Sequence, residues 1–170
     1  MTPEPVATPS AAAVGPYSPA VRAGDWIVVS GQIGIDPSNG QLVAGGVVAQ
    51  ARQALANLAA ILNDCGCGWE HVAKVALFVA TESPQWMQEV NAVYAEVVGE
   101  NGPPSLVGND RPGRSLPPPL VGAASGASSG NDRPGRSLPA RSTVGVAWLP
   151  MGAEFEIEAW VYKPQNRPEA

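Results

Sequence analysis

The chain has 170 residues, of which 45% are hydrophobic, and a formal net charge of −5. This length and composition suit one domain with its own core, while the acidic balance argues against nucleic acid as a partner. The two cysteines, Cys65 and Cys67, have a spacing that is poor for a structural disulfide, so we expect a reduced, cytoplasmic location. The N-terminal residues lack the pattern of a signal peptide and no apolar run is long enough to span a bilayer, so we expect no membrane partner.

The first elements are predicted from local pattern. Residues 1–13 are rich in proline, alanine and threonine, and we expect a loose N-terminal tail. The continuous apolar run at residues 26–30 is typical of a buried strand. Turn-forming residues at 36–40 include an Asn-Gly pair, which favours positive φ, and residues 41–44 are predicted to return as a short strand.

The apolar period changes after residue 47 and predicts an amphipathic helix. Its expected buried stripe is Val48, Ala51, Leu55, Leu58, Ile61 and Leu62, with Gln50, Gln53 and Asn57 off the stripe. Residues 72–79 are predicted to form a strand. A second helix is expected to begin at residues 83–84, where serine can cap and proline fits the first turn, and to end at Gly99. Its predicted stripe is Met87, Val90, Tyr94 and Val97.

Residues 101–138 interrupt this pattern. They contain the segment GNDRPGRSLP at residues 108–117, which recurs at residues 130–139. No strand or helix periodicity survives there, so we expect a low-complexity insertion within one domain that spans residues 1–170. Two interpretations stay open. The segment is either a lid or tether that leads into Arg141, or a surface insertion that the fold tolerates at about 0.6 kcal/mol per doubling of loop length.

The C-terminal region predicts two last strands, of which the second alternates strictly. Phe155, Ile157, Ala159 and Val161 face one side, and Glu156, Glu158, Trp160 and Tyr162 face the other. The second set is too apolar for open solvent and too charged for a core, so it is predicted to line a cleft or a subunit interface. The resulting order is β-β-α-β-α-β-β, in which two helices can cover only one face of the sheet.

Several stretches, in this order, resemble the reactive intermediate deaminase (RidA/YjgF) family: GPYSPAVRAGDWIVVSGQIG, GGVVAQARQALANLAAIL, VNAVYAEV and PARSTVGVAWLPMGAEFEIEA. The resemblance implies a chorismate-mutase-like α+β fold, assembled as a homotrimer with sites between subunits. It also implies an enzyme that hydrolyses 2-aminoacrylate-type enamines and 2-imino acids to 2-keto acids and ammonia. This chemistry requires neither a metal nor another cofactor.

The resemblance further assigns roles to individual residues. Arg141 would hold the substrate carboxylate, because guanidinium is a permanently charged planar fork. Glu156 would orient the attacking water and act as an acid or base. Without the resemblance, the sequence pattern identifies Arg141 and Glu156 only as charged residues on strands. The implied pocket is completed by Tyr17, Ser30, Gly31, Asn91 and Thr143, the last of which stands where family members often have cysteine.

Other chemistries are less well supported by the sequence. A zinc or copper site could use Cys65, Cys67 and His71, but a fourth ligand is not evident. With a single histidine in the chain, a nucleophile–histidine triad is not expected. Two other functions stay open: a non-catalytic binder of small carboxylates, which would keep the same arginine, and the ribonuclease or translation-inhibiting activity described in the family.

Deleting residues 103–136 should leave the fold intact, because this segment offers no periodic apolar face to a core. The melting temperature of the deletion variant should stay the same or rise. Thermal unfolding and an imine-hydrolysis assay on the same preparation check this expectation. A variant that fails to fold, or that folds but loses activity, would support the lid.

Overall fold

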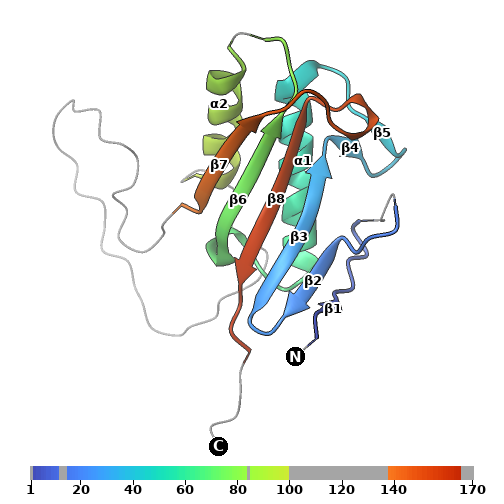
Figure 1. The fold of residues 1–170 in the computed structure, drawn as a ribbon, viewed down its shortest axis with the longest axis vertical. Coiled ribbons are helices and arrows are strands. Elements are labelled where there is room, and N and C mark those ends of the chain that lie inside the picture. The colour runs from blue at the N-terminus through green and yellow to red at the C-terminus, as the bar shows by residue number, and fades with distance from the viewer. Residues whose placement is uncertain (1, 12–14, 84, 100–137, 166–170) are drawn as a thin grey trace, which may run out of the picture.

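The computed structural model describes residues 2–11, 15–83, 85–99 and 138–165. Two α-helices, α1 (Gly46–Asp64) and α2 (Trp86–Val98), pack against one face of a six-stranded sheet (Figure 1). The strands are β1 (Glu4–Pro5), β2 (Ala20–Ala23), β3 (Trp26–Ile33), β6 (Val72–Val79), β7 (Ala140–Gly145) and β8 (Phe155–Tyr162), in the sheet order β1-β2-β3-β8-β6-β7. The predicted α+β class, a mixed sheet with both α-helices on one face, is confirmed.

Neither helix is long and apolar enough to cross a membrane in the part of the chain that the structure describes. Of the insertion predicted at residues 101–138, only Leu138 falls within the described ranges. The single-domain organisation and the role of that insertion therefore stay predictions.

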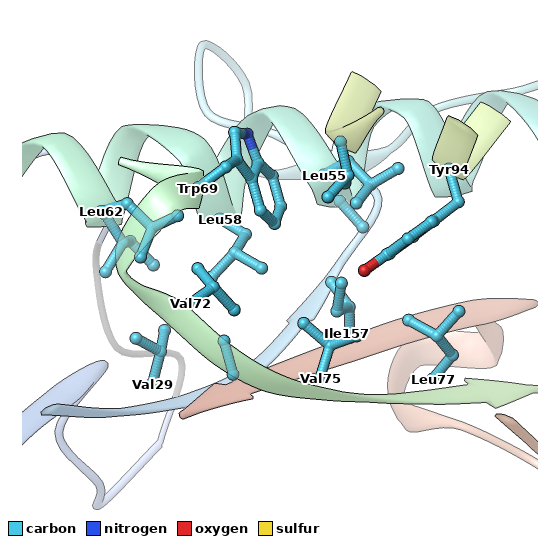
Figure 2. Packing of buried hydrophobic residues seen from close by; sticks show 14 of the residues in the cluster. Val29, Leu55, Leu58, Leu62, Trp69, Val72, Val75, Leu77, Tyr94 and Ile157 are labelled. Carbon is cyan, nitrogen blue, oxygen red and sulfur yellow. The ribbon is translucent and has the colours of Figure 1, made fainter. Parts of the chain in front are cut away.

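Strand β8 lies at the centre of the sheet, antiparallel to β3 on one side and to β6 on the other. Its predicted alternation is confirmed, since Phe155, Ile157, Ala159 and Val161 have no exposed surface. Figure 2 shows Ile157 on the helix side of the sheet, together with Val75 and Leu77 of β6. Burying such side chains contributes about 1.5–3 kcal/mol each, which holds the helices on this face.

The first hairpin of the sheet differs from the prediction. Strand β2, which the sequence analysis missed, pairs with β3 through a turn at Gly24, where φ is +64°. The turn predicted at residues 36–40 is present, but it joins β4 (Ile35–Asp36) to β5 (Gln41–Leu42) in a separate two-stranded ladder. Strand β2 is short and lacks a clear apolar alternation, so its pairing depends on backbone hydrogen bonds that composition does not report.

The N-terminal segment also departs from the loose tail expected for residues 1–13. Strand β1 extends the sheet by pairing with β2. Further along, Ser10 donates hydrogen bonds from its backbone N–H and its hydroxyl to the Asp64 carboxylate, at 2.9 and 3.0 Å. These contacts connect the described part of the segment to the end of α1.

Helix α1 follows its predicted apolar stripe with two exceptions. Val48 is 36% exposed, whereas Gln50 is only 7% exposed, so the prediction is wrong at both positions. The amide oxygen of Gln50 accepts a hydrogen bond from the backbone N–H of Glu154 at 2.8 Å. That bond satisfies a polar group that would otherwise be costly to bury.

Helix α2 begins at Trp86 rather than at residues 83–84. The Ser83 hydroxyl donates to the Glu89 carboxylate at 3.1 Å, so it does not cap the helix as predicted. Met87, assigned to the apolar stripe, is 44% exposed. The buried residues of α2 are Val90, Val93, Tyr94 and Val98.

The second face of the sheet carries the other residues of the β8 alternation. Among the described residues, no helix lies on this face (Figure 1). The Trp26 and Tyr162 rings lie 5.2 Å apart, and Lys74 Nζ lies 5.6 Å from the Trp160 ring centre. Aromatic rings and charges therefore share a surface that no helix of the described ranges covers, as expected for a face that meets a partner.

Candidate active site

A pocket of about 1040 Å³ lies beside β3 and brings together four of the predicted site residues: Tyr17, Ser30, Gly31 and Glu156. The N-terminal segment contributes Ser10, α1 contributes Asn57, and the connection between β7 and β8 contributes Met151. Among the described residues that line this pocket, Glu156 is the one that carries a charge. The described lining of the pocket therefore offers an acid or base but no cation for a substrate carboxylate.

A bulge in β3 shapes one wall of this pocket. Val29 pairs with Ala159 and Gln32 pairs with Ile157, so Ser30 and Gly31 stand opposite a single β8 residue, Glu158. A bulge of this kind bends the strand and redirects its groups, and it recurs beside active sites. The Ser30 hydroxyl donates to the Ser18 carbonyl at 2.8 Å, which ties the bulge to the segment that carries Tyr17.

The Glu156 carboxylate lies over Gly31. A Cβ atom added at Gly31 would overlap the Glu156 side chain, starting with Oε1, so glycine at this bulge is required for the observed position of the acid. Burial, and secondly the charge of Glu158, raises the pKa of Glu156 above its ordinary value. A carboxyl group with a raised pKa holds and exchanges a proton closer to neutral pH, as an acid–base catalyst must.

A second cluster forms around Arg141 on β7. Its Nη2 donates to the Asn91 Oδ1 atom of α2 at 2.8 Å, and its Cζ atom lies 4.9 Å from the centre of the Tyr94 ring. Arg141 pairs with Val75 and Thr143 with Leu77, both on β6. The structure thus brings Arg141 and Asn91 into contact, with Thr143 two residues further along the same strand.

These two clusters lie on opposite faces of the sheet. Arg141 shares the helix face with its neighbour Val75, whereas Glu156 alternates with the buried residues Phe155 and Ile157. The seven predicted residues therefore form two groups in one chain: Tyr17, Ser30, Gly31 and Glu156 in the pocket, and Arg141, Asn91 and Thr143 beside α2. A single chain does not bring the arginine to the glutamate.

The alternative metal site has a different explanation. The Cys67 thiol donates to the Cys65 carbonyl, and His71 Nδ1 accepts from the Gly68 backbone N–H at 3.1 Å. Burial raises the pKa of Cys65 to about 11, which keeps its thiol protonated. Across the described residues, no three histidine, cysteine, aspartate or glutamate side chains gather as a metal site would require.

Sequence reasoning missed Met151 and the contact of Tyr94 with Arg141. Met151 has φ +58°, a conformation that is rare outside glycine; the flanking Pro150 and Gly152 indicate a turn, but they do not indicate that Met151 lines the pocket. Tyr94 was predicted as a core residue of α2, and it is one, since only 6% of it is exposed. The contact of Tyr94 with Arg141 depends on the pairing of β7 with β6, which the sequence does not indicate.

The fold and the two clusters define a small α+β domain whose candidate site residues are divided between the two faces of one sheet. Residues 8–115 match the family described as endoribonuclease L-PSP, and the chain belongs to that family, which confirms the resemblance to the reactive intermediate deaminases. The matched range includes Tyr17, Ser30, Gly31 and Asn91, whereas Arg141, Thr143 and Glu156 lie beyond it.

Relatives support the same assignment. The chain is 47% identical over 87 residues to the mouse protein named 2-iminobutanoate/2-iminopropanoate deaminase, a match that covers 51% of this chain and 63% of the mouse protein. A crystal structure from Thermotoga maritima is similar with 34% identity and a TM-score of 0.69, covering 97% of this chain and all of that one. Escherichia coli TdcF with bound serine is similar with 26% identity and a TM-score of 0.68, covering 94% and 98%.

Proposed function

We propose that this protein hydrolyses 2-imino acids, and the 2-aminoacrylate-type enamines from which they form, to 2-keto acids and ammonia. The observation that carries the proposal is Glu156, a half-buried acid with a raised pKa that lies over the glycine of a β-bulge in an open pocket. The name of the mouse relative supports the imine as substrate. Such an activity removes reactive metabolites.

The chemistry needs one anchor, one water and one acid–base group. An enamine gains a proton at its β-carbon and becomes the iminium, whose C2 atom is electrophilic. Water adds to C2 and passes a proton to Glu156, which returns it to the nitrogen. The carbinolamine then gives its hydroxyl proton to the Glu156 carboxylate and expels ammonia, which leaves with that proton as ammonium and frees the keto acid. Because the substrate is already electrophilic, positioning supplies much of the rate increase, and Arg141 is assigned to hold the carboxylate.

We further propose that each site forms between two copies of the chain, in a homotrimer. Among the described residues, the pocket with Glu156 is lined by no cation, and no acid–base group is seen in contact with Arg141, so each half lacks what the other supplies. Packing the uncovered sheet face, with Trp26, Trp160 and Tyr162, against a neighbour would bury those rings. A closed cyclic assembly repeats the same contact for every copy.

The experiment that tests the activity generates 2-iminopropanoate enzymatically and follows its decay with and without this protein. We expect faster decay with pyruvate and ammonia as products. Decay that stays at the rate in buffer, with folded and assembled protein, would contradict the proposal. Light scattering on the same sample measures the mass, and an active monomer would contradict the shared site.

A non-catalytic carboxylate binder is the second candidate, since TdcF is described with bound serine. Calorimetry with serine and with 2-oxobutanoate separates the two functions. A binder should bind these carboxylates without accelerating imine decay. Loss of binding in Arg141→Ala is expected in either case, so the decay assay is the measurement that distinguishes them.

Replacing Gly31 with alanine should lower imine hydrolysis by about 10- to 100-fold, because displacing a reacting group by a small distance has effects of that size. The added Cβ would overlap the Glu156 carboxylate, which can move away, so the protein should still fold. Steady-state rates and thermal unfolding check both expectations. Gly145→Ala is the matched control, since its nearest contact is the Val79 carbonyl at 4.0 Å. Full activity in Gly31→Ala would show that Glu156 does not act from this position.

A further inference from the structure

We propose that Tyr94 is a positioning residue for Arg141: its ring holds the guanidinium against α2, ready for a substrate carboxylate. The inference rests on the proposed function, which gives Arg141 its carboxylate partner. Tyr94 itself would not touch the substrate. It would act through the guanidinium, using the face of its ring and not its hydroxyl.

The geometry shows two contacts of different kind on one guanidinium. Asn91 accepts a hydrogen bond from Nη2 at 2.8 Å, and the Tyr94 ring lies 4.9 Å from Cζ. Asn91 and Tyr94 are three residues apart on α2, so both lie on the same side of the helix. A hydrogen bond fixes one N–H direction, and a ring face fixes the plane, so together they define the orientation of the fork.

Arg141 needs such support because of where it lies. Strand β7 is at the edge of the sheet and Arg141 is exposed, so its long side chain would otherwise sample many rotamers. Tyr94 is buried and anchored in the helix–sheet core. No described carboxylate forms an ion pair with Arg141. Among the described residues, the contacts given for the guanidinium are the Tyr94 ring and the Asn91 amide oxygen, so its charge stays available to a substrate carboxylate.

The hydroxyl of Tyr94 does not take part. Figure 2 shows it pointing away from the helix, toward the sheet and the apolar side chains of Leu77 and Ile157. It is buried and has no hydrogen-bond partner among the described residues. Burial raises the pKa of Tyr94 to about 12, so the phenol stays neutral. The ring and the hydroxyl can therefore be separated by substitution.

Three variants test the proposal: Tyr94→Phe keeps the ring, Tyr94→Leu removes it, and Val98→Ala disturbs the same helix core elsewhere. We expect the KM for 2-iminopropanoate and the Kd for 2-oxobutanoate to rise about 3- to 30-fold in Tyr94→Leu, the range expected for a lost cation–π contact. Tyr94→Phe should match the parent protein and should be at least as stable, because it removes an unpaired buried hydroxyl. Val98→Ala should lower the melting temperature without changing KM or Kd.

A readout that does not depend on activity is the NMR signal of the Arg141 side-chain Nε–H, identified by its absence in Arg141→Lys. The ring current should shift it in the parent and in Tyr94→Phe, and the shift should vanish in Tyr94→Leu. A parent that shows the shift but neither binds nor hydrolyses these compounds would contradict the proposed function and leave the contact standing. An unshifted signal, a Tyr94→Phe variant as poor as Tyr94→Leu, or a Val98→Ala variant with the same rise in KM would overturn the positioning role.

Discussion

Replacing Arg141 with alanine should abolish measurable imine hydrolysis while the assembly and the melting temperature are preserved. Losing a desolvated charge partner costs about 2 to 5 kcal/mol, or roughly 30-fold to several thousand-fold in rate at low substrate concentration. Arg141→Lys should also be poor, because an ammonium group cannot reproduce the fork that Asn91 and Tyr94 orient. Steady-state kinetics at low substrate and light scattering of each variant provide the measurements.

The duplicated segment supplies the controls for this experiment. Arg114 and Arg136 lie in near copies of the same motif, RPGRS, within the predicted low-complexity insertion, and fixing such a segment around an anchor would cost about 1 to 2 kcal/mol per residue. Arg141 is already held by the strand it belongs to. Arg114→Ala and Arg136→Ala should therefore stay within a few-fold of the parent. An inactive Arg136→Ala beside an active Arg141→Ala would show that the wrong arginine has been assigned.

Mixing two inactive variants should restore activity. If each site takes Arg141 from one chain and Glu156 from its neighbour, then equal amounts of Arg141→Ala and Glu156→Gln, unfolded and refolded together, should yield about one quarter of the parent activity, since random cyclic assembly pairs the two intact halves with that frequency. The physical reason is the placement of the two residues on opposite faces of the sheet. The rate of imine decay in the mixture, compared with each variant refolded alone, is the measurement.

The matched control mixes Glu156→Gln with Gly31→Ala. Both changes lie in the same pocket, so both chains keep Arg141 but neither offers an intact Glu156 half, and no activity beyond that of the separate variants should appear. Recovery in this control would mean that refolding itself changes the rate. No recovery in the first mixture, with mixed assemblies demonstrated by mass, would place both residues of a working site in the same chain.

The sequence predicted those features that follow from local periodicity. The alternation of β8 was correct because each side chain of a central strand is assigned to a face by its position alone. Met87 and Gln50 were misassigned because both lie at the margin of an apolar stripe, where burial depends on the neighbouring element. For Gln50 that neighbour is the backbone of Glu154, 104 residues away in the chain.

The division of the site could not be predicted from spacing. Arg141 and Glu156 are close in the chain, and the family resemblance implied a site between subunits that contains both without indicating which chain supplies each residue. Their faces depend on β7 pairing with β6 and not with β8, and on the register that sets Arg141 beside Val75. The bulge at Ser30 and Gly31 was likewise hidden, since a glycine in a strand is compatible with several irregularities. The sequence indicated which residues belong to the site, but the order of the strands was needed to show which of them lie together.

Because the two clusters lie on opposite faces, the rate of the proposed hydrolysis should also depend on the concentration of the protein. If each site is shared between two chains as proposed, a chain that is alone has no complete site, and the fraction of working sites equals the fraction of chains that have bound their neighbours. Specific activity, ordinarily a constant of an enzyme, would then fall on dilution through the dissociation constant of the assembly. The concentration of the protein in the cell would then set the specific activity as well as the number of molecules.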